Sequence, residues 1–160
     1  MSDYLESVSG PLEIPSTYNG FTVTGIGSSA FKWCYLTSIS IPDSVTSIGS
    51  KAFNYCRSLS SITIGDSVTS IGNRAFEFCG SLTSITIPNS VTSIEEYAFR
   101  YCSSLTSITF EGDAPTFGSN VFSDSDSVTV YYYEDITGFT TPTFQGRHSQ
   151  MLIRADTMPR

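Results

Sequence analysis

One stretch of the sequence decides the fold: Leu59-Ser-Ser-Ile62-Thr-Ile64-Gly-Asp-Ser-Val68-Thr-Ser-Ile71-Gly72-Asn-Arg-Ala75-Phe76-Glu-Phe-Cys79. The chain contains further copies of this stretch. The Ser-Val-Thr-Ser-Ile motif recurs at 44–48, 67–71 and 90–94, and Ala-Phe pairs recur at 30/31, 52/53, 75/76 and 98/99. The leucines that head the copies lie 23 residues apart, at Leu36, Leu59, Leu82 and Leu105. A fixed period of this length predicts stacked coils of one small structural unit.

Each coil is too small to bury its own apolar side chains, so stacking must build a shared core of apolar columns. Ile62 and Ile64 alternate with polar residues, which predicts a short strand with both isoleucines inward. A second inward-facing segment is expected over 68–71, and a single helical turn over 73–79. Equivalent strands of successive coils are then parallel neighbours, about 4.8 Å apart.

This pattern resembles the leucine-rich-repeat superfamily, in particular the short BspA-like repeats of bacterial surface proteins. The residues of the quoted stretch and its copies carry the resemblance, which covers about 12–127. It implies a right-handed β/α superhelix dominated by β-structure. Parallel short strands would form the concave face, and second short strands and single helical turns would form the other faces. The resemblance also implies adhesion to host matrix proteins and co-aggregation.

The repeat divides the chain into four expected parts. These are an N-terminal lead-in at 1–11, about five coils at 12–127, a C-terminal cap at 128–153 and a tail at 154–160. The first coil has extra residues at 16–22, where Asn19-Gly20 predicts the tight turn of a hairpin. In the cap, Phe139 and Phe144 are expected to plug the open end of the core.

The strand that begins the cap can be aligned with the repeat in two ways. The 23-residue rule places Val128, Tyr131 and Tyr133 inward, and we favour this alignment. A rival alignment places Val128, Val130 and Tyr132 inward instead.

The composition excludes several classes of protein. The 160 residues fit one domain, and 28 Ser and 19 Thr accompany only 14% charged residues. A net charge of −7 with eight basic residues argues against nucleic-acid binding. One histidine argues against a His-based triad or a multi-His metal site, and no stretch is apolar for the length of a membrane span. Without a phosphate-binding loop or a nucleophile–base pair, we expect no enzyme, catalytic residue, metal or cofactor.

Three columns of side chains are candidate binding sites. Two are hydroxyl columns on the outward side of the first strands: Ser38, Ser61, Ser84 and Ser107, and beside them Ser40, Thr63, Thr86 and Thr109. The third is aromatic and comprises Trp33, Tyr55, Phe78 and Tyr101. The hydroxyl columns are either a solvated strand surface or a recognition surface for protein or glycan. The aromatic column either packs on neighbouring coils or faces solvent, where it could stack on sugars or anchor a protein.

The cysteines form a fourth column, at Cys34, Cys56, Cys79 and Cys102. We expect free buried thiols that act as small apolar side chains, since they would point the same way along the column. Stacked neighbours come within the Cα range of a disulfide, so a disulfide or a metal stays as the alternative. The acidic patch of Glu111, Asp113, Asp124 and Asp126 lacks the spacing of a calcium loop, which favours a solvated loop. We expect His148 at the surface.

The function that follows is an interaction module without catalysis. We expect a monomeric module of a secreted or cell-surface bacterial protein that binds a host matrix protein or a bacterial surface protein. A glycan-binding module and a structural spacer are the alternatives. The first residues lack the pattern of a secretory signal, so a surface location presumes a signal and an anchor outside this sequence, and a cytoplasmic location stays open.

Overall fold

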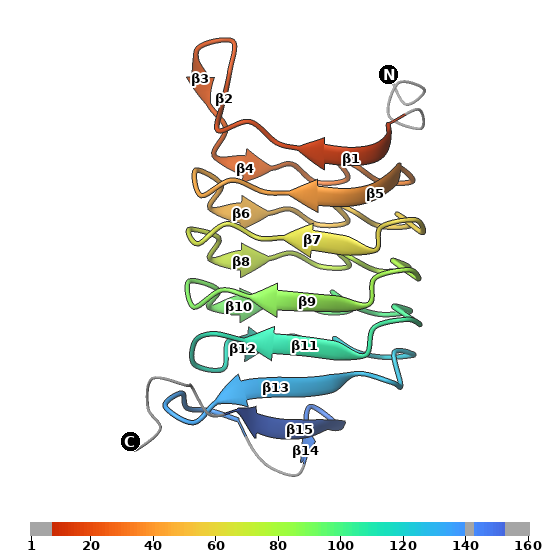
Figure 1. Ribbon diagram of the computed structural model, residues 1–160, viewed down its shortest axis with the longest axis vertical. Helices are drawn as coiled ribbons and strands as arrows, with labels where there is room; N and C mark the ends of the chain where they lie inside the picture. The colour runs from red at the N-terminus through yellow and green to blue at the C-terminus, as the bar shows by residue number, and fades with distance from the viewer. Residues whose placement is uncertain (1–7, 140–142, 153–160) are drawn as a thin grey trace, which may run out of the picture.

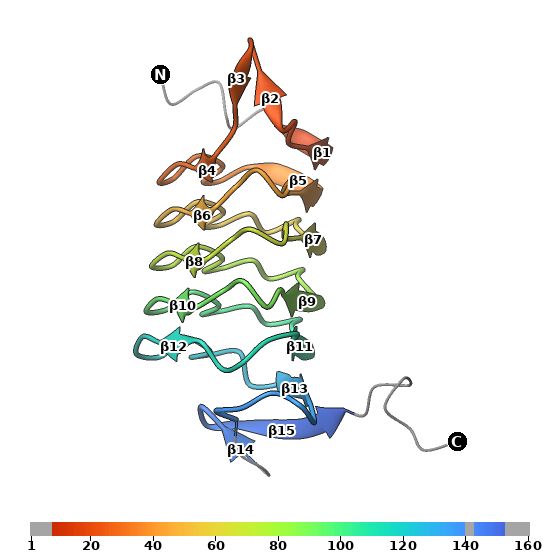
Figure 2. The ribbon, with the colours of Figure 1, turned by 90° about the vertical axis from the view of Figure 1, so that its left-hand side faces the viewer.

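The computed structural model describes residues 8–139 and 143–152. It is a stack of coils with longer strands along one face and two-residue strands along another (Figures 1 and 2). The long-strand face contains β1 (Ser9–Glu13), β5 (Tyr35–Ser40), β7 (Ser61–Thr63), β9 (Ser84–Ile87), β11 (Ser107–Phe110), β13 (Thr129–Tyr133) and β15 (Arg147–Leu152). The short-strand face contains β4 (Gly25–Ile26), β6 (Ser47–Ile48), β8 (Ser70–Ile71), β10 (Ser93–Ile94) and β12 (Thr116–Phe117). The expected β-dominated solenoid is confirmed.

Strands of the same kind pair in parallel, and successive coils keep equivalent residues side by side. Ile39 pairs with Ile62 and Ile48 with Ile71, as the repeat predicts. The short strands form one sheet from β4 to β12. The long strands form two sheets, β1-β5-β7 and β9-β11-β13-β15, which adjoin at β7 and β9. At that junction the hydrogen bond from the Thr83 amide to the Ser60 carbonyl lengthens to 3.5 Å.

The third side of each coil is a turn segment, and the expected helical turn is wrong. The turn segments are residues 27–34, 49–56, 72–79, 95–102 and 118–125, and the described residues include no helix, so none that could cross a membrane. Alternate N–H groups donate to their own coil and to the next one. For example, the Ala75 amide donates to the Gly72 carbonyl at 3.1 Å and the Phe76 amide to the Ala98 carbonyl at 2.9 Å. Arg74 and Phe78 have φ of 55° and 63°, and a right-handed helix cannot contain such residues.

The core consists of the expected apolar columns. The Leu, Val, Ala and Phe positions of the central coils are almost fully buried, including Leu59, Val68, Ala75 and Phe76. One column is a ladder of parallel phenylalanine rings, with centroids 5.2–5.9 Å apart, at Phe31, Phe53, Phe76, Phe99 and Phe122. Offset stacks at this separation add attraction beyond the burial of apolar area.

In the strand that begins the cap, the favoured alignment is wrong and the rival one is right. Val130 pairs with Ile108 and Tyr132 with Phe110, and both Val130 and Tyr132 are buried. Tyr131 and Tyr133 are only half-buried. The 23-residue rule fails here because the step from β11 to β13 is 22 residues long, and a slip of one residue exchanges the two faces of a strand.

Both ends of the stack carry extra elements. At the N-terminal end, β2 (Thr17–Tyr18) and β3 (Phe21–Thr22) form the expected hairpin, which projects beyond β1 (Figure 1). At the other end β15 pairs in parallel with β13, and β14 (Thr143–Phe144) pairs antiparallel with β15. Phe139 and Phe144 lie 4.7 Å apart between ring centroids and pack against the core, as expected. The tail expected at 154–160 lies outside the described residues.

Candidate interaction surfaces

The hydroxyl columns lie side by side on the long-strand face. Ser61 pairs with Ser38 and Thr63 with Ser40, while Ser107 pairs with Ser84 and Thr109 with Thr86. The four hydroxyls of β7 and β9 are exposed, whereas those of β5 and β11 are half-buried. Where the two long-strand sheets adjoin, a cleft of about 280 Å³ is lined by residues that include Thr63, Asp66, Thr86 and Glu111. The two hydroxyl columns can offer hydrogen bonds.

The aromatic column forms a continuous ladder along the turn segments. Ring centroids are 3.9 Å apart for Trp33 and Tyr55, 4.2 Å for Tyr55 and Phe78, and 4.5 Å for Phe78 and Tyr101. All four residues have left-handed φ, between 55° and 66°. Residues with a side chain seldom adopt this backbone conformation, which costs roughly 1–2 kcal/mol for each such residue. Trp33 is 45% exposed and the other three rings are half-buried.

This stacking decides what the ladder can contact. Each ring covers a face of its neighbour, so a sugar ring has no room to lie flat between two of them. The ladder instead presents ring edges to the solvent, and Trp33, at its N-terminal end, is the most exposed member. A surface of ring edges suits contact with protein side chains better than stacking by a row of sugars.

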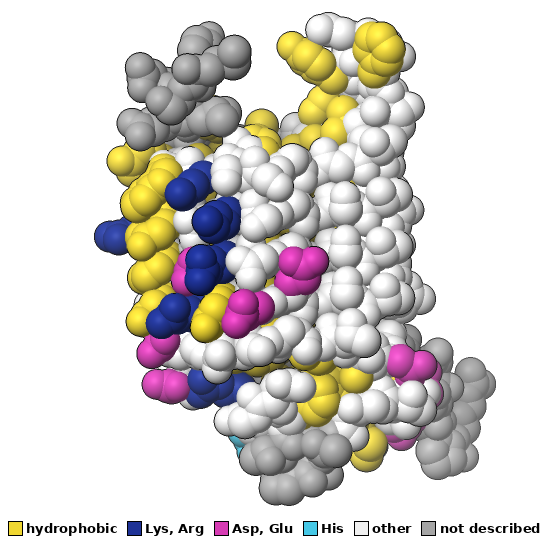
Figure 3. Space-filling view, turned by 180° about the vertical axis from the view of Figure 1, so that it is seen from behind, with side chains coloured by type: hydrophobic (Ala, Val, Ile, Leu, Met, Phe, Trp, Pro, Cys, Tyr) yellow, Lys and Arg dark blue, Asp and Glu magenta, His cyan; other side chains and the backbone are white. Residues whose placement is uncertain are grey.

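Basic side chains gather beside this ladder. Lys32 Nζ lies 5.7 Å from the Trp33 ring centroid, Arg57 Cζ lies 5.4 Å from that of Tyr55, and Arg100 Cζ lies 4.5 Å from that of Tyr101. Tyr97 receives two guanidinium groups, from Arg74 at 5.1 Å and Arg100 at 5.0 Å. Figure 3 shows the basic groups as a column beside apolar side chains on this side of the molecule. We call this surface the turn face: the ladder with Lys32, Lys51, Arg57, Arg74, Tyr97 and Arg100.

Carboxylates neutralise only the C-terminal half of the turn face. Glu77, which is nearly buried, lies 3.7 Å from Arg74 and 3.8 Å from Arg100. Arg100 also binds Asp124 at 3.2 Å, and this hydrogen bond raises the pKa of the guanidinium. Within the described residues, no carboxylate forms an ion pair with Lys32, Lys51 or Arg57. Among the described residues, the positive charge of the N-terminal half therefore has no ion-pair partner, in a protein of net charge −7.

A cleft opens in this N-terminal half. It has a volume of about 340 Å³ and is lined by Trp33, Cys34, Tyr35, Tyr55 and Arg57. Tyr35 is 60% exposed. Aromatic edges and a guanidinium thus meet at one hollow, next to the first cysteine of the column.

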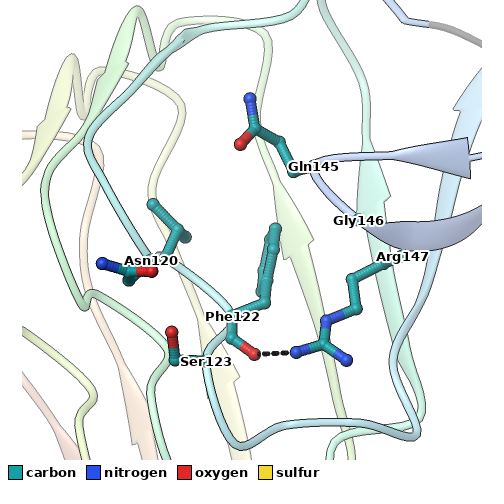
Figure 4. Close-up of a pocket in the computed structure, with 7 residues that line it drawn as sticks. Asn120, Phe122, Ser123, Gln145, Gly146 and Arg147 are labelled. Carbon is teal, nitrogen blue, oxygen red and sulfur yellow. Dashed lines mark hydrogen bonds between the residues drawn. The ribbon is translucent and has the colours of Figure 1, made fainter.

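Two further hollows lie at the ends of the stack. Near the cap, Arg147 lines a cleft of about 340 Å³ and donates to the Phe122 carbonyl at 2.5 Å (Figure 4). It also donates to the Asp126 carboxylate at 2.8 Å. Arg147 therefore joins β15 to the last repeat through hydrogen bonds. At the opposite end, an apolar hollow of about 390 Å³ lies between β1 and the hairpin, whose Tyr18 and Phe21 are 67% and 78% exposed.

The remaining candidate groups fall into structural roles. All four cysteines are buried and unbridged. Asp113 accepts hydrogen bonds from the Thr137 amide at 2.6 Å and hydroxyl at 2.9 Å, which lowers the pKa of its carboxyl. The described residues contain no group of three side chains placed to hold a metal ion. His148 is exposed, as expected.

Comparison with known proteins adds a family and several related structures. The profile described as "BspA type Leucine rich repeat region" matches residues 24–150 in six copies. No curated protein matches the chain. A solved leucine-rich-repeat protein of T. pallidum is 31% identical, with a TM-score of 0.70, over 76% of this chain and 57% of its own.

Two other solved structures are surface proteins or antigens by name. A leucine-rich cell-surface protein of Faecalibacterium prausnitzii is 31% identical with a TM-score of 0.65, over 81% of this chain and 32% of its own. The pneumococcal vaccine antigen PcpA is 27% identical with a TM-score of 0.62, over 79% of this chain and 41% of its own. The chain therefore spans between 32% and 57% of the length of these three relatives.

Proposed function

This chain belongs to the BspA-type leucine-rich-repeat family of bacterial proteins, and from that premise we propose that it is a non-enzymatic protein-binding module whose binding surface is the turn face. We further propose that it acts in adhesion at the bacterial surface or outside the cell. The names of the F. prausnitzii and pneumococcal relatives support this location. The partner would be a host matrix protein or another bacterial surface protein.

One observation carries the choice of surface. Tryptophan, tyrosine and arginine dominate the energetics of protein interfaces, and the turn face gathers these residue types. Stacking and ion pairs already hold Tyr55, Tyr97 and Arg100 in place, so little side-chain entropy would be lost on binding. The hydroxyl columns, in contrast, consist of serine and threonine, of which interface hot spots contain few.

The test compares variants of the two faces in the same assay. Biolayer interferometry would measure binding of the chain to a panel of host matrix proteins and bacterial surface proteins. The first variant combines Trp33→Ser with Tyr97→Ser on the turn face. The matched control combines Thr63→Lys with Thr86→Lys at exposed positions of the long-strand face. Circular dichroism would confirm that both variants keep the fold.

We expect the turn-face variant to lose at least tenfold in affinity and the control to keep wild-type binding. The opposite pattern would move the site to the long-strand face and refute the choice of surface. If wild-type protein bound nothing on the panel at micromolar concentration, the spacer alternative would replace the proposal.

Glycan binding is the second candidate, and the cleft at Trp33 and Arg57 favours it. The exposed edges of Trp33 and Tyr35 beside the Arg57 guanidinium could hold one acidic sugar. A glycan array would show sugar binding that Arg57→Ala abolishes. A blank array would leave protein binding as the proposed function.

A further inference from the structure

The first cysteine of the column departs from the others in its contacts. The thiols of Cys56, Cys79 and Cys102 each donate to a phenylalanine carbonyl of an earlier coil, at 2.9–3.2 Å. Cys34 instead has its Sγ 2.7 Å from Cys56 Sγ. The expectation that the thiols all point the same way along the column therefore fails at this pair.

The sequence supplies the cause of this departure. Cys34 belongs to the first turn segment of the described residues, and residues 8–26 include no earlier turn segment that could supply the carbonyl that the later cysteines use. One residue separates Cys34 from Leu36, whereas two residues separate each later cysteine from its leucine. As a result β5 begins at Tyr35, immediately after Cys34. In the later copies a turn separates the cysteine from the strand; for example, the Leu59 amide donates to the Cys56 carbonyl at 3.1 Å.

The two backbones lie at the right separation for a covalent bridge. The Phe31 and Trp33 amides donate to the Ala52 and Asn54 carbonyls at 2.8 Å and 2.9 Å. These bonds hold the two turn segments as hydrogen-bonded neighbours, and such neighbours lie about 4.8 Å apart. Cysteine Cα atoms in disulfides are usually about 4.4–6.8 Å apart. Closing the bridge therefore requires a change in side-chain torsions and little movement of the chain.

Cys34 is also the member of the pair that lies at a surface cleft. It lines the cleft with Trp33, Tyr35, Tyr55 and Arg57, although its side chain is nearly covered. The contact with Cys56 lowers the pKa of the Cys34 thiol to about 7, because the Cys56 thiol can donate to the Cys34 thiolate in place of the Phe31 carbonyl. The same contact, together with burial, raises the pKa of Cys56, and burial raises the pKa of Cys79 and Cys102. Thiolates are the reactive form, so Cys34 would react first.

We propose that Cys34 and Cys56 are a redox pair that forms a disulfide between the first two turn segments. With a small disulfide such as oxidised glutathione as the oxidant, the Cys34 thiolate attacks one sulfur and releases one glutathione thiolate. Cys56 then loses its proton and attacks the Cys34 sulfur of the mixed disulfide, which releases the second glutathione thiolate. The two cysteine protons end on the two glutathione molecules, and the protein loses two electrons to the oxidant.

The bridge would fix the N-terminal end of the solenoid, where fewer neighbours hold the coils. It spans the position at which Trp33 stacks on Tyr55, so oxidation would lock the first step of the aromatic ladder. The bridge can form whatever the turn face binds. Its formation would make that face more rigid in oxidising than in reducing surroundings.

The test incubates the folded protein with mixtures of oxidised and reduced glutathione. The remaining thiols are alkylated, and peptide mapping by mass spectrometry locates any bridge. We expect one disulfide, between Cys34 and Cys56, with a mass loss of 2 Da and with Cys79 and Cys102 left as thiols. From the entropy of closing a loop of this size, the oxidised form should melt roughly 5–10 °C higher than the reduced form.

Variants separate this pair from the rest of the column. Cys79→Ser with Cys102→Ser should still form the bridge, whereas Cys34→Ser should form none and show the same melting temperature in both buffers. The proposal is overturned if the wild-type protein keeps four free thiols, stops at glutathionylated Cys34, or joins another pair. Because these outcomes are read on the wild-type chain, they do not depend on the folding of the variants.

Discussion

The two phenylalanines of one turn segment give the sharpest test of the packing. Phe76 and Phe78 are two residues apart, and each has an aromatic neighbour in the coil before and after it. Phe76 is fully buried in the core ladder, whereas Phe78 stands in the half-buried surface ladder. Replacing each by alanine removes the same atoms from two environments.

The expected losses in free energy of unfolding differ roughly two- to threefold. Truncating a fully buried phenylalanine costs about 3–5 kcal/mol, because apolar burial is lost and a cavity remains. Truncating Phe78 removes two surface stacks, together worth roughly 1–2 kcal/mol. With an m-value of about 2 kcal/mol/M in urea, Phe76→Ala should lower the unfolding midpoint by roughly 2 M and Phe78→Ala by less than about 1 M.

Urea unfolding followed by far-UV circular dichroism measures both costs. Fluorescence of Trp33, the only tryptophan, gives a second readout located in the first turn segment. Coincident transitions would justify a two-state treatment. Should Phe78→Ala cost as much as Phe76→Ala, the division into a core ladder and a surface ladder would be wrong.

Three further predictions test other contacts. Gly72→Ala should lower the stability of the fold by about 1–3 kcal/mol in thermal melts, because an added Cβ would lie 2.7 Å from the Ser50 amide nitrogen. Gly80→Ala should be neutral or stabilising, because the atom nearest to its added Cβ is 3.6 Å away. Ser125→Ala should lower the free energy of unfolding by about 1–3 kcal/mol, because Ser125 Oγ donates to the Phe99 carbonyl at 2.7 Å and accepts from the Cys102 amide at 2.9 Å. Ser125→Cys should keep most of the wild-type stability. Because the pKa of Asp113 is lowered in the folded state, its carboxylate stabilises the fold fully above the unfolded pKa of about 3.9, and this stabilisation is lost as the pH falls through the folded pKa. Asp113→Asn should therefore flatten the acid limb of a curve of folding stability against pH.

The sequence predicts the stack, its columns and most of its register because these follow from periodicity alone. Apolar residues that recur every 23 positions have to meet their copies, whatever the local backbone does. The positions of Ile62 and Phe76 could therefore be assigned without a structure. The cap register failed because the step from β11 to β13 is one residue shorter than the period.

The conformation of the turn segments could not be predicted for a different reason. The usual sequence signal for a positive φ is glycine or asparagine. In this chain the left-handed positions of the central turn segments hold other residues, namely Lys51, Tyr55, Arg74, Phe78, Tyr97 and Tyr101. Side chains of this kind favour a helical interpretation of the stretch 73–79. The stacking of neighbouring coils overrides that local preference.

The same backbone explains why the aromatic ladder lies at the surface. Tyr55 and Phe78 donate their amides to the Glu77 and Arg100 carbonyls of the following coil, both at 2.9 Å. These bonds hold each residue in the left-handed conformation, while Phe53 and Phe76 of the same segments fill the core. The repeat thus fixes where a side chain at this position stands, but not which side chain it is. Exchange of residues at the ladder positions and their basic neighbours would change the surface without disturbing the core, so this surface can vary while the fold is kept.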